Sequence, residues 1–234
     1  MEYLRECAQK LNIELSNEQL DQYRIFYDML IETNKVMNLT AITEKKEVIV
    51  KHFLDSIAIA QYVDLSHGKI IDIGTGAGFP GIPLKILYPD CEITLLDSLN
   101  KRIRFIENVT KALNLSKVTA IHGRAEDYAH QKEYRHQYDF AVSRAVANLS
   151  TLSEYCLPFV KTGGQFISYK SGNVDEELEQ SKNAIFLCGG KINKVERFRL
   201  EEADADRTFV FIKKKMNTSK QYPRKSGTPS KNPL

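Results

Sequence analysis

A short run of β-branched residues at 69–73 leads directly into four glycines within residues 74–81. Because glycine has no Cβ, it lets the chain turn sharply and lets backbone N–H groups approach a ligand closely. Pro80 and Pro83 follow, and proline suits the first turn of a helix, where its missing N–H would have no partner in any case. A strand, a glycine turn and a helix start in this order predict a site for a nucleotide-like cofactor. A tight turn without a ligand would not require so many glycines.

The position of the glycines favours one class of cofactor. The last three match the G-x-G-x-x-G pattern of dinucleotide-binding proteins, but that pattern places its first glycine directly after the strand. Here the strand ends at Gly74, and counting from Gly74 puts Phe79 where a third glycine should allow close packing of helix and strand. Asp72 precedes the turn, where a carboxylate repels a pyrophosphate but accepts from the ammonium group of S-adenosylmethionine (SAM), directly or through water. We therefore expect SAM rather than NAD.

Strand-like and helix-like segments alternate after residue 66, which predicts a parallel sheet with helices on both faces. The expected strands cover residues 69–73, 92–96, 118–122, 139–143, 164–169, 190–198 and 207–213. The expected helices cover residues 82–87, 101–113, 150–160 and 175–187. No helix separates the last two strands, so they should form an antiparallel hairpin at one edge. This is the α/β architecture of class I SAM-dependent methyltransferases, with a Rossmann-like, mostly parallel sheet of seven strands and an antiparallel last strand.

Further candidate cofactor contacts follow the second and third strands. The second strand ends at Asp97, where a carboxylate can bind ribose hydroxyls, a feature of NAD and SAM proteins alike. After the third strand, Ala125 and Glu126 either contact the adenine ring or cap a short helix.

Two cations follow the fourth and fifth strands. Ligands of open α/β sheets bind outside the carboxyl ends of the strands, so both positions belong to the expected site. Arg144 lies where the donor methyl group and its target should meet, and it either binds them or pairs with Glu126 or Asp72. Lys170 is a second cation at the rim. The catalytic residue stays open, and Arg144 is the candidate.

A helical extension precedes the sheet, and a basic tail follows it. Ser16 and Gln19 form a capping-box start, and a second amphipathic segment covers about residues 44–62. We divide the chain into a helical extension (1–66), a methyltransferase domain (67–215) and a flexible basic tail (216–234). From Lys213 onward there are seven Lys and Arg and no acidic residue, and the Pro, Ser, Thr, Lys and Gly content predicts disorder in the free tail. The tail either serves solubility alone or contacts nucleic-acid phosphates.

The composition is that of a soluble globular protein, with 42% hydrophobic and 27% charged residues. No apolar run is long enough to span a membrane, and the first residues lack the character of a signal peptide, so we expect no membrane contact and a cytoplasmic location. The four cysteines are scattered without C-x-x-C spacing, which argues against zinc and for reduced thiols. We expect no metal and a monomeric protein.

Absent residue patterns narrow the target of methylation. The segment after the fourth strand reads Ser143-Arg144-Ala145-Val146 and lacks the Asn/Asp-Pro-Pro-aromatic loop common in enzymes that methylate exocyclic amines. Cys156 is not next to a proline, as the nucleophile for carbon-5 methylation of pyrimidines commonly is. Guanine N7 has its own lone pair and needs no deprotonation, so alignment and electrostatics suffice for its methylation.

Six stretches match one family in combination: NLT at 38–40, KHFLDS at 51–56, DIGTGAGFPG at 72–81, LDSLNKR at 96–102, SRA at 143–145 and YPRKSGTP at 222–229. With them the chain resembles the RsmG (GidB) family of bacterial small-subunit ribosomal RNA guanine-N7 methyltransferases. The resemblance implies 16S ribosomal RNA in the decoding region as substrate and a cytoplasmic enzyme. The alternative is an RNA-binding or ribosome assembly protein that keeps the SAM fold without catalysis, and a nicotinamide dehydrogenase is a third option.

The resemblance also assigns residues to the site. The family's cofactor positions fall on Gly74, Phe79, Ala125, Glu126 and Arg144. It further implies that His52 and Asp55, one helical turn apart, face the pocket, unless they form only a local pair. The full expected set of cofactor contacts is Asp72, Gly74, Gly76, Gly78, Phe79, Asp97, Ala125, Glu126 and Arg144. The expected substrate contacts are His52, Asp55, Arg144, Lys170, Lys220, Arg224 and Lys225.

Overall fold

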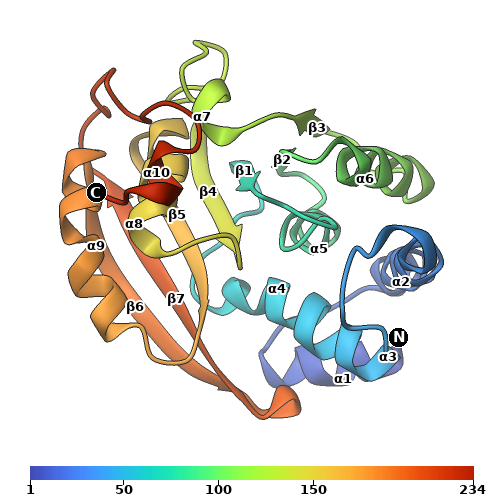
Figure 1. The fold of residues 1–234 in the computed structure, drawn as a ribbon. Coiled ribbons are helices and arrows are strands. Elements are labelled where there is room, and N and C mark those ends of the chain that lie inside the picture. The colour runs from blue at the N-terminus through green and yellow to red at the C-terminus, as the bar shows by residue number, and fades with distance from the viewer.

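Seven strands form one sheet in the computed structural model, which describes residues 1–234 (Figure 1). The strand order is β3-β2-β1-β4-β5-β7-β6, and β7 runs antiparallel to both of its neighbours. The strands are β1 (Lys69–Ile73), β2 (Glu92–Asp97), β3 (Val118–His122), β4 (Tyr138–Arg144), β5 (Val160–Ser171), β6 (Gly190–Leu200) and β7 (Ala205–Lys214). The predicted mostly parallel sheet with an antiparallel hairpin at one edge is therefore confirmed.

Helices cover both faces of the sheet, and each face has its own apolar core. One face carries α5 (Gly81–Leu87) and α6 (Asn100–Ala112), and the other carries α7 (Ala125–Tyr128), α8 (Leu149–Cys156) and α9 (Asp175–Leu187). Successive residues of a strand point to opposite faces, so Ile70 belongs to the first core and Ile71 and Ile73 to the second. None of the helices combines the length and the apolar character that crossing a membrane requires.

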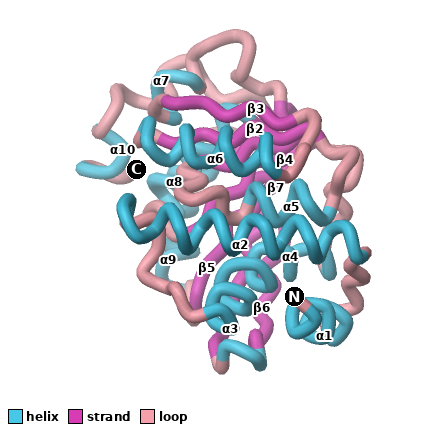
Figure 2. Tube along the Cα trace, turned by 90° about the vertical axis from the view of Figure 1, so that its right-hand side faces the viewer, coloured by secondary structure: helices cyan, strands magenta, loops and turns pink.

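The chain before β1 consists of helices and turns. These are α1 (Glu2–Lys10), α2 (Asn17–Met37), α3 (Lys45–Val48), a π-helical turn (Ile49–Leu54), α4 (Asp55–Ile57) and a 3-10 turn (Ala58–Gln61). At the start of α2 the capping box is complete, because Gln19 N donates to Ser16 Oγ and Ser16 N donates to Gln19 Oε1. Figure 2 shows α2 beside α5 and α6 over the sheet. These helices share the first core with the sheet, so residue 66 does not separate two cores.

The C-terminal tail packs on the second face, in contrast to the mobile arm expected from its composition. The Arg135 guanidinium donates to the carbonyl oxygens of Thr218, Ser219 and Tyr222 at 2.8 to 3.1 Å. The buried ammonium of Lys214 binds the Thr218 hydroxyl at the start of the tail. A short helix, α10 (Thr228–Lys231), lies against α8 (Figure 1). Composition does not reveal this packing because much of it uses backbone carbonyls, which every residue has.

Candidate functional site

The glycine turn lies at the switch in strand order. β2 and β3 lie on one side of β1 and β4 lies on the other, so a crevice opens beyond the carboxyl end of β1. The backbone N–H groups of Gly74 and Thr75 both donate to Leu96 O, at 2.8 and 3.1 Å. Gly74, Gly76 and Gly78 have φ values of 71°, 62° and 96°, which other residues rarely adopt. Glycine at these positions therefore allows the turn to form.

Asp72 supports the turn from inside the protein. Its fully buried Oδ2 accepts hydrogen bonds from Thr75 Oγ1 at 2.7 Å and from Gly81 N at 2.9 Å. Burial raises the pKa of this carboxyl to about 7, and its Oδ1 has no hydrogen-bond partner. Side chains alternate along β1, so Asp72 points toward the face of the sheet that α5 covers. It does not point toward the cavities beyond the carboxyl end of the strand. The structure thus gives Asp72 the turn as its partner, and the contact with the SAM ammonium, direct or through water, stays a prediction.

Asp97 connects the end of β2 to the glycine turn. Its Oδ2 accepts from Gly76 N at 2.9 Å and from Arg102 Nη1 at 3.3 Å, and its Oδ1 accepts from Leu99 N at 2.9 Å. A carboxylate offers about four acceptor positions, so one position remains on Oδ1 for a further donor. A ribose hydroxyl, the partner expected from the sequence, is a donor of this kind.

Two cavities flank the glycine turn. The α7 cavity has a volume of about 140 Å³ and is lined by Ala125 and Glu126, among others. The glycine cavity has a volume of about 380 Å³ and extends along the turn itself. Gly74, Asp97 and Val146 line both cavities, so the two spaces meet at these residues. An elongated ligand with two chemically different halves would fit the pair.

Phe79 joins the glycine turn to the N-terminal helices. Its ring is stacked on Phe26 of α2 with a centroid distance of 5.2 Å, and its centroid is 6.0 Å from that of Phe53. The imidazole of His52 is stacked on Phe79 at 4.7 Å. The aromatic residue at position 79 therefore attaches the helical extension to the turn, while it also lines the glycine cavity.

His52 lies on the π-helical turn and is neutral. Its Nε2 is 2.9 Å from Thr40 Oγ1, and its Nδ1 is 3.4 Å from Arg144 Nη2. A guanidinium can only donate, so Nδ1 accepts and the ring proton belongs on Nε2, which donates to Thr40. Burial, and after it the charge of Arg144, lower the pKa of His52 to about 4. Turns of π-helix are frequent at functional sites, and periodicity alone predicted an ordinary helix here.

Asp55 holds two arginines at the end of β4. Its Oδ2 accepts from Arg144 Nη1 at 2.7 Å, and its Oδ1 accepts from Arg207 Nε at 2.7 Å. The three side chains are only 8 to 18% exposed. Arg144 is thus an ion-pair partner, as one interpretation of the sequence held, but its partner is Asp55 and not Glu126 or Asp72. A local pair between His52 and Asp55 does not form.

A third space, the arginine cavity, adjoins the glycine cavity. Its volume is about 470 Å³, and His52, Arg144 and Ala145 line both spaces. Lys51, Lys170 and Arg207 also line it, together with the carboxylates of Asp55 and Glu177, so the lining is mixed with an excess of basic side chains. The residues at the meeting point are therefore those where two ligands would come into contact.

Two of the basic residues expected at phosphates are engaged within the protein. Lys170 is 13% exposed and donates to Glu177 Oε1 at 2.7 Å. Arg224 pairs with the buried Glu154 of α8 at 2.8 Å. Both are therefore less available to a ligand than the sequence suggested. The exposed members of the set are Lys220 and Lys225.

The family model described as "GidB: rRNA small subunit methyltransferase G" matches residues 19–208. The chain belongs to this family. The Ribosomal RNA small subunit methyltransferase G of Lachnoclostridium phytofermentans is 52% identical over 225 residues, which are 96% of this chain and 93% of the relative. The protein of the same name from Bacillus subtilis is 48% identical over 234 residues, 100% of this chain and 98% of that relative. The family resemblance stated from the sequence is thereby confirmed over the whole chain.

Solved structures share the fold at much lower sequence identity. TYW2 of M. jannaschii in complex with AdoMet has a TM-score of 0.56 and 13% identity, and the match covers 74% of this chain and 79% of that one. NSun6 from Pyrococcus horikoshii with SFG has a TM-score of 0.56 and 15% identity, with 76% and 57% covered. These likenesses support the predicted Rossmann-like methyltransferase fold.

Three residues of the site were not found from the sequence. Arg207 lies 152 positions from its partner Asp55, and no local pattern indicates a pair of that kind. Thr40, which binds His52, lies in the NLT stretch, so the family resemblance contained a signal for it. Val146 lies in the segment after β4, where only its neighbour Arg144 was singled out.

Proposed function

We propose that this protein transfers the methyl group of SAM to N7 of a guanine in the decoding region of 16S ribosomal RNA. One observation carries the proposal: nearly the whole chain aligns with curated relatives named as methyltransferases of small-subunit ribosomal RNA. The meeting of the glycine cavity and the arginine cavity at Arg144 supports it further, because a donor and an acceptor of the methyl group need adjoining spaces.

The residues around the glycine turn fit SAM as cofactor. Ala125 and Glu126 would hold the adenine ring in the α7 cavity, and Asp97 would accept from the ribose. A Cβ on Gly76 would meet no atom within 4 Å, so the turn is open to the methionine part of the cofactor on the side of the glycine cavity. When bound, SAM supplies an electrophilic methyl group on its sulfonium.

The protein has to align the methyl group of SAM with guanine N7, and the reaction needs no proton transfer to a protein group. Guanine N7 attacks with its own lone pair, and the one titratable ring at the junction, His52, already accepts at Nδ1 from Arg144. Arg144, fixed by Asp55, presents guanidinium N–H groups at the junction, and arginine commonly binds the O6 edge of guanine. Holding the two reactants in line removes much of the entropic barrier.

Basic residues beyond the junction would bind the RNA backbone. Lys51 and Arg207 line the arginine cavity, and Lys220 and Lys225 are exposed on the tail. Such contacts carry no sequence information, but they position the RNA. The proposal includes a monomeric enzyme, because one chain contains both spaces. It also includes a cytoplasmic location.

Methyl transfer to ribosomal RNA from a strain that lacks this protein tests the proposal. The purified protein and labelled SAM are incubated with naked 16S RNA and with 30S subunits, and the RNA is digested and mapped by mass spectrometry. One guanine should gain one methyl group at N7, in one or both substrates. The Asp97→Ala variant, which loses the turn and ribose contacts, should be inactive in the same assay.

Other functions predict different results in this experiment. A non-catalytic RNA-binding or assembly protein would bind the RNA and leave both substrates unmethylated. A dehydrogenase would bind NADH and show no affinity for SAM. Either result, or a methyl group at another atom of the base, would contradict the proposal.

A further inference from the structure

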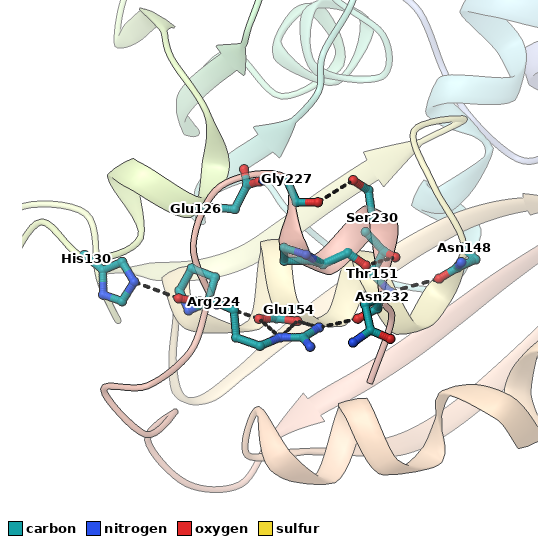
Figure 3. Close-up of polar contacts among 11 residues, drawn as sticks. Glu126, His130, Asn148, Thr151, Glu154, Arg224, Gly227, Ser230 and Asn232 are labelled. Atoms are coloured by element: carbon teal, nitrogen blue, oxygen red, sulfur yellow. Dashed lines mark hydrogen bonds and ion pairs between the residues drawn. The ribbon is translucent and has the colours of Figure 1, made fainter.

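The C-terminal tail connects two helices whose residues line the α7 cavity. Glu126 of α7 and Tyr155 of α8 both line this cavity. Figure 3 shows the tail passing between α7 and α8, with polar contacts to side chains of both. On the side of α7, His130 Nε2 is 2.8 Å from Pro223 O. The tail is therefore placed to fix the width of the cavity.

The carboxylate of Glu126 receives hydrogen bonds from the tail. Gly227 N donates to Glu126 Oε1 at 2.8 Å, and Ser226 Oγ lies 3.4 Å from the same oxygen. Glu126 is only 5% exposed. A buried carboxylate that loses its donors is costly, so without the tail this side chain would move toward water. The orientation of Glu126 in the cavity therefore depends on Gly227.

An ion pair fixes the tail to α8. Glu154, whose side chain is 1% exposed, accepts from Arg224 Nε at 3.0 Å and from Arg224 Nη2 at 2.8 Å. The Arg224 backbone N–H donates to the same carboxylate, and Arg224 Nη2 also donates to Asn232 O at 2.8 Å. Thr151 Oγ1 donates to Pro229 O at 3.0 Å, which adds a second link to α8. Gly227 lies between these two links in the chain, so they hold it in place.

We propose that the C-terminal tail supports one wall of the cofactor site from behind: the Arg224–Glu154 pair holds the tail on α8, and Gly227 holds Glu126 in position for the adenine ring. The inference rests on the proposed function only in taking SAM as the ligand. Arg224 and Gly227 act through Glu126 and are positioning residues. Their loss should weaken cofactor binding and raise the KM for SAM, while kcat at saturating SAM changes little.

Binding of S-adenosylhomocysteine, the product form of the cofactor, tests the proposal in the full-length protein. The variants Arg224→Ala and Gly227→Pro disturb the link at two different points. Arg224→Ala removes the ion pair, and Gly227→Pro removes the N–H that binds Glu126 and also forces the backbone at residue 227 away from its φ of 83°. Arg224→Lys keeps the charge, and Lys231→Ala is the control that removes one exposed charge from the same segment. Calorimetry measures the dissociation constant, and thermal unfolding shows whether each variant is folded. Binding to a 16S RNA fragment is measured without cofactor.

The expected result is a selective loss of cofactor affinity. The dissociation constant should rise about tenfold in Arg224→Ala and in Gly227→Pro, the size expected when a buried carboxylate loses a donor, and less in Arg224→Lys. Lys231→Ala should bind the cofactor as the unaltered protein does, and RNA binding should stay within about threefold for all variants, as for surface changes.

Two results would overturn the inference. One is an unchanged dissociation constant in a folded Gly227→Pro variant. The other is an equal loss of RNA affinity in Arg224→Ala and Lys231→Ala with cofactor binding intact, which would make the tail a phosphate-binding arm. If the unaltered protein binds S-adenosylhomocysteine but methylates no ribosomal RNA, the proposed function fails while this comparison remains valid.

Discussion

Val146 packs its side chain against the backbone of Gly74. A Cβ built on Gly74 would lie 2.5 Å from Val146 Cγ2, closer than real side chains approach each other. Ala145, just before, has a φ of 57°, so the segment after β4 turns in a left-handed conformation to bring Val146 to this place. The contact ties the segment that carries Arg144 to the glycine turn, at the point where the α7 cavity and the glycine cavity meet.

Replacing Gly74 by alanine should destabilise the protein more than the same change at Gly76. Both positions have positive φ, which costs an alanine about 1 kcal/mol, but a Cβ at Gly76 would meet no atom within 4 Å. The collision with Val146 should add about 1 to 2 kcal/mol at position 74. Denaturant unfolding measures the difference, and a Val146→Ala background should remove it. Equal losses of stability at the two positions would mean that the Val146 side chain moves aside without an energetic cost.

Replacing Asp55 by asparagine should be strongly destabilising. The carboxylate neutralises both Arg144 and Arg207 in a largely buried cluster, and removing one partner from such a pair costs about 3 kcal/mol. Glu47→Gln is the control, because the Glu47–Lys51 pair is exposed and worth about 0.5 kcal/mol or less. Urea unfolding compares the two variants. The rate of methyl transfer at saturating SAM should also fall in Asp55→Asn, since Arg144 loses its orientation. Normal turnover in this variant would show that methyl transfer does not depend on the orientation of Arg144.

The alternation of strands and helices was predictable because each element repeats its own apolar pattern. The seven strands and the helices α5, α6, α8 and α9 follow from a period of two or of about 3.6 residues, together with the glycine turn. Asp97 and the glycines could be placed because they directly follow or end predicted strands, and parallel strands end at one edge of the sheet. The orientation of Asp72 was less accessible, because it depends on which face of β1 the residue occupies.

The remaining features depend on contacts between residues far apart in the chain. Asp55 meets Arg207 across 152 positions, and Glu154 meets Arg224 across 70, so neither pair has a local signature. The tail has the composition of a disordered segment, yet the half-buried Arg135 donates to its carbonyl groups. Composition measures the side chains of a segment and cannot detect partners for its backbone.

Acid should destabilise the unaltered protein more than a His52→Phe variant. The pKa of His52 is lowered from 6.5 to about 4 in the folded state, so between these values the unfolded chain binds a proton that the folded chain does not. The free energy of unfolding therefore decreases as the pH falls from 6.5 toward 4. Phenylalanine can stack on Phe79 but cannot titrate. Between pH 6.5 and 4.5 the free energy of unfolding of the His52→Phe variant should therefore decrease by about 2 kcal/mol less than that of the unaltered protein.

Urea unfolding at several pH values checks this prediction. The charged neighbours of His52 are Lys51, Asp55 and Arg144, and all three remain in the variant, so their own titration is common to both proteins. The variant also loses the contacts to Thr40 and Arg144, which lowers its stability at every pH and leaves the slope unaffected. Parallel curves for the two proteins would show that His52 takes up its proton over the same pH range in the folded and unfolded states, and would contradict the lowered pKa.

Removing Lys220 and Lys225 together should reduce the salt dependence of RNA binding. Both side chains are exposed on the docked tail, and each phosphate contact contributes about 0.7 to the slope of log K against log salt for single-stranded RNA. The slope should therefore fall by about 1.4 if both lysines bind phosphate. The matched control is Lys111→Ala with Lys117→Ala, two exposed lysines in the last turn of α6 and just before β3, at the opposite end of the sheet from the glycine turn. Since both double variants lose the same charge, a change confined to the tail variant indicates direct contact, and equal changes indicate only the net charge of the protein.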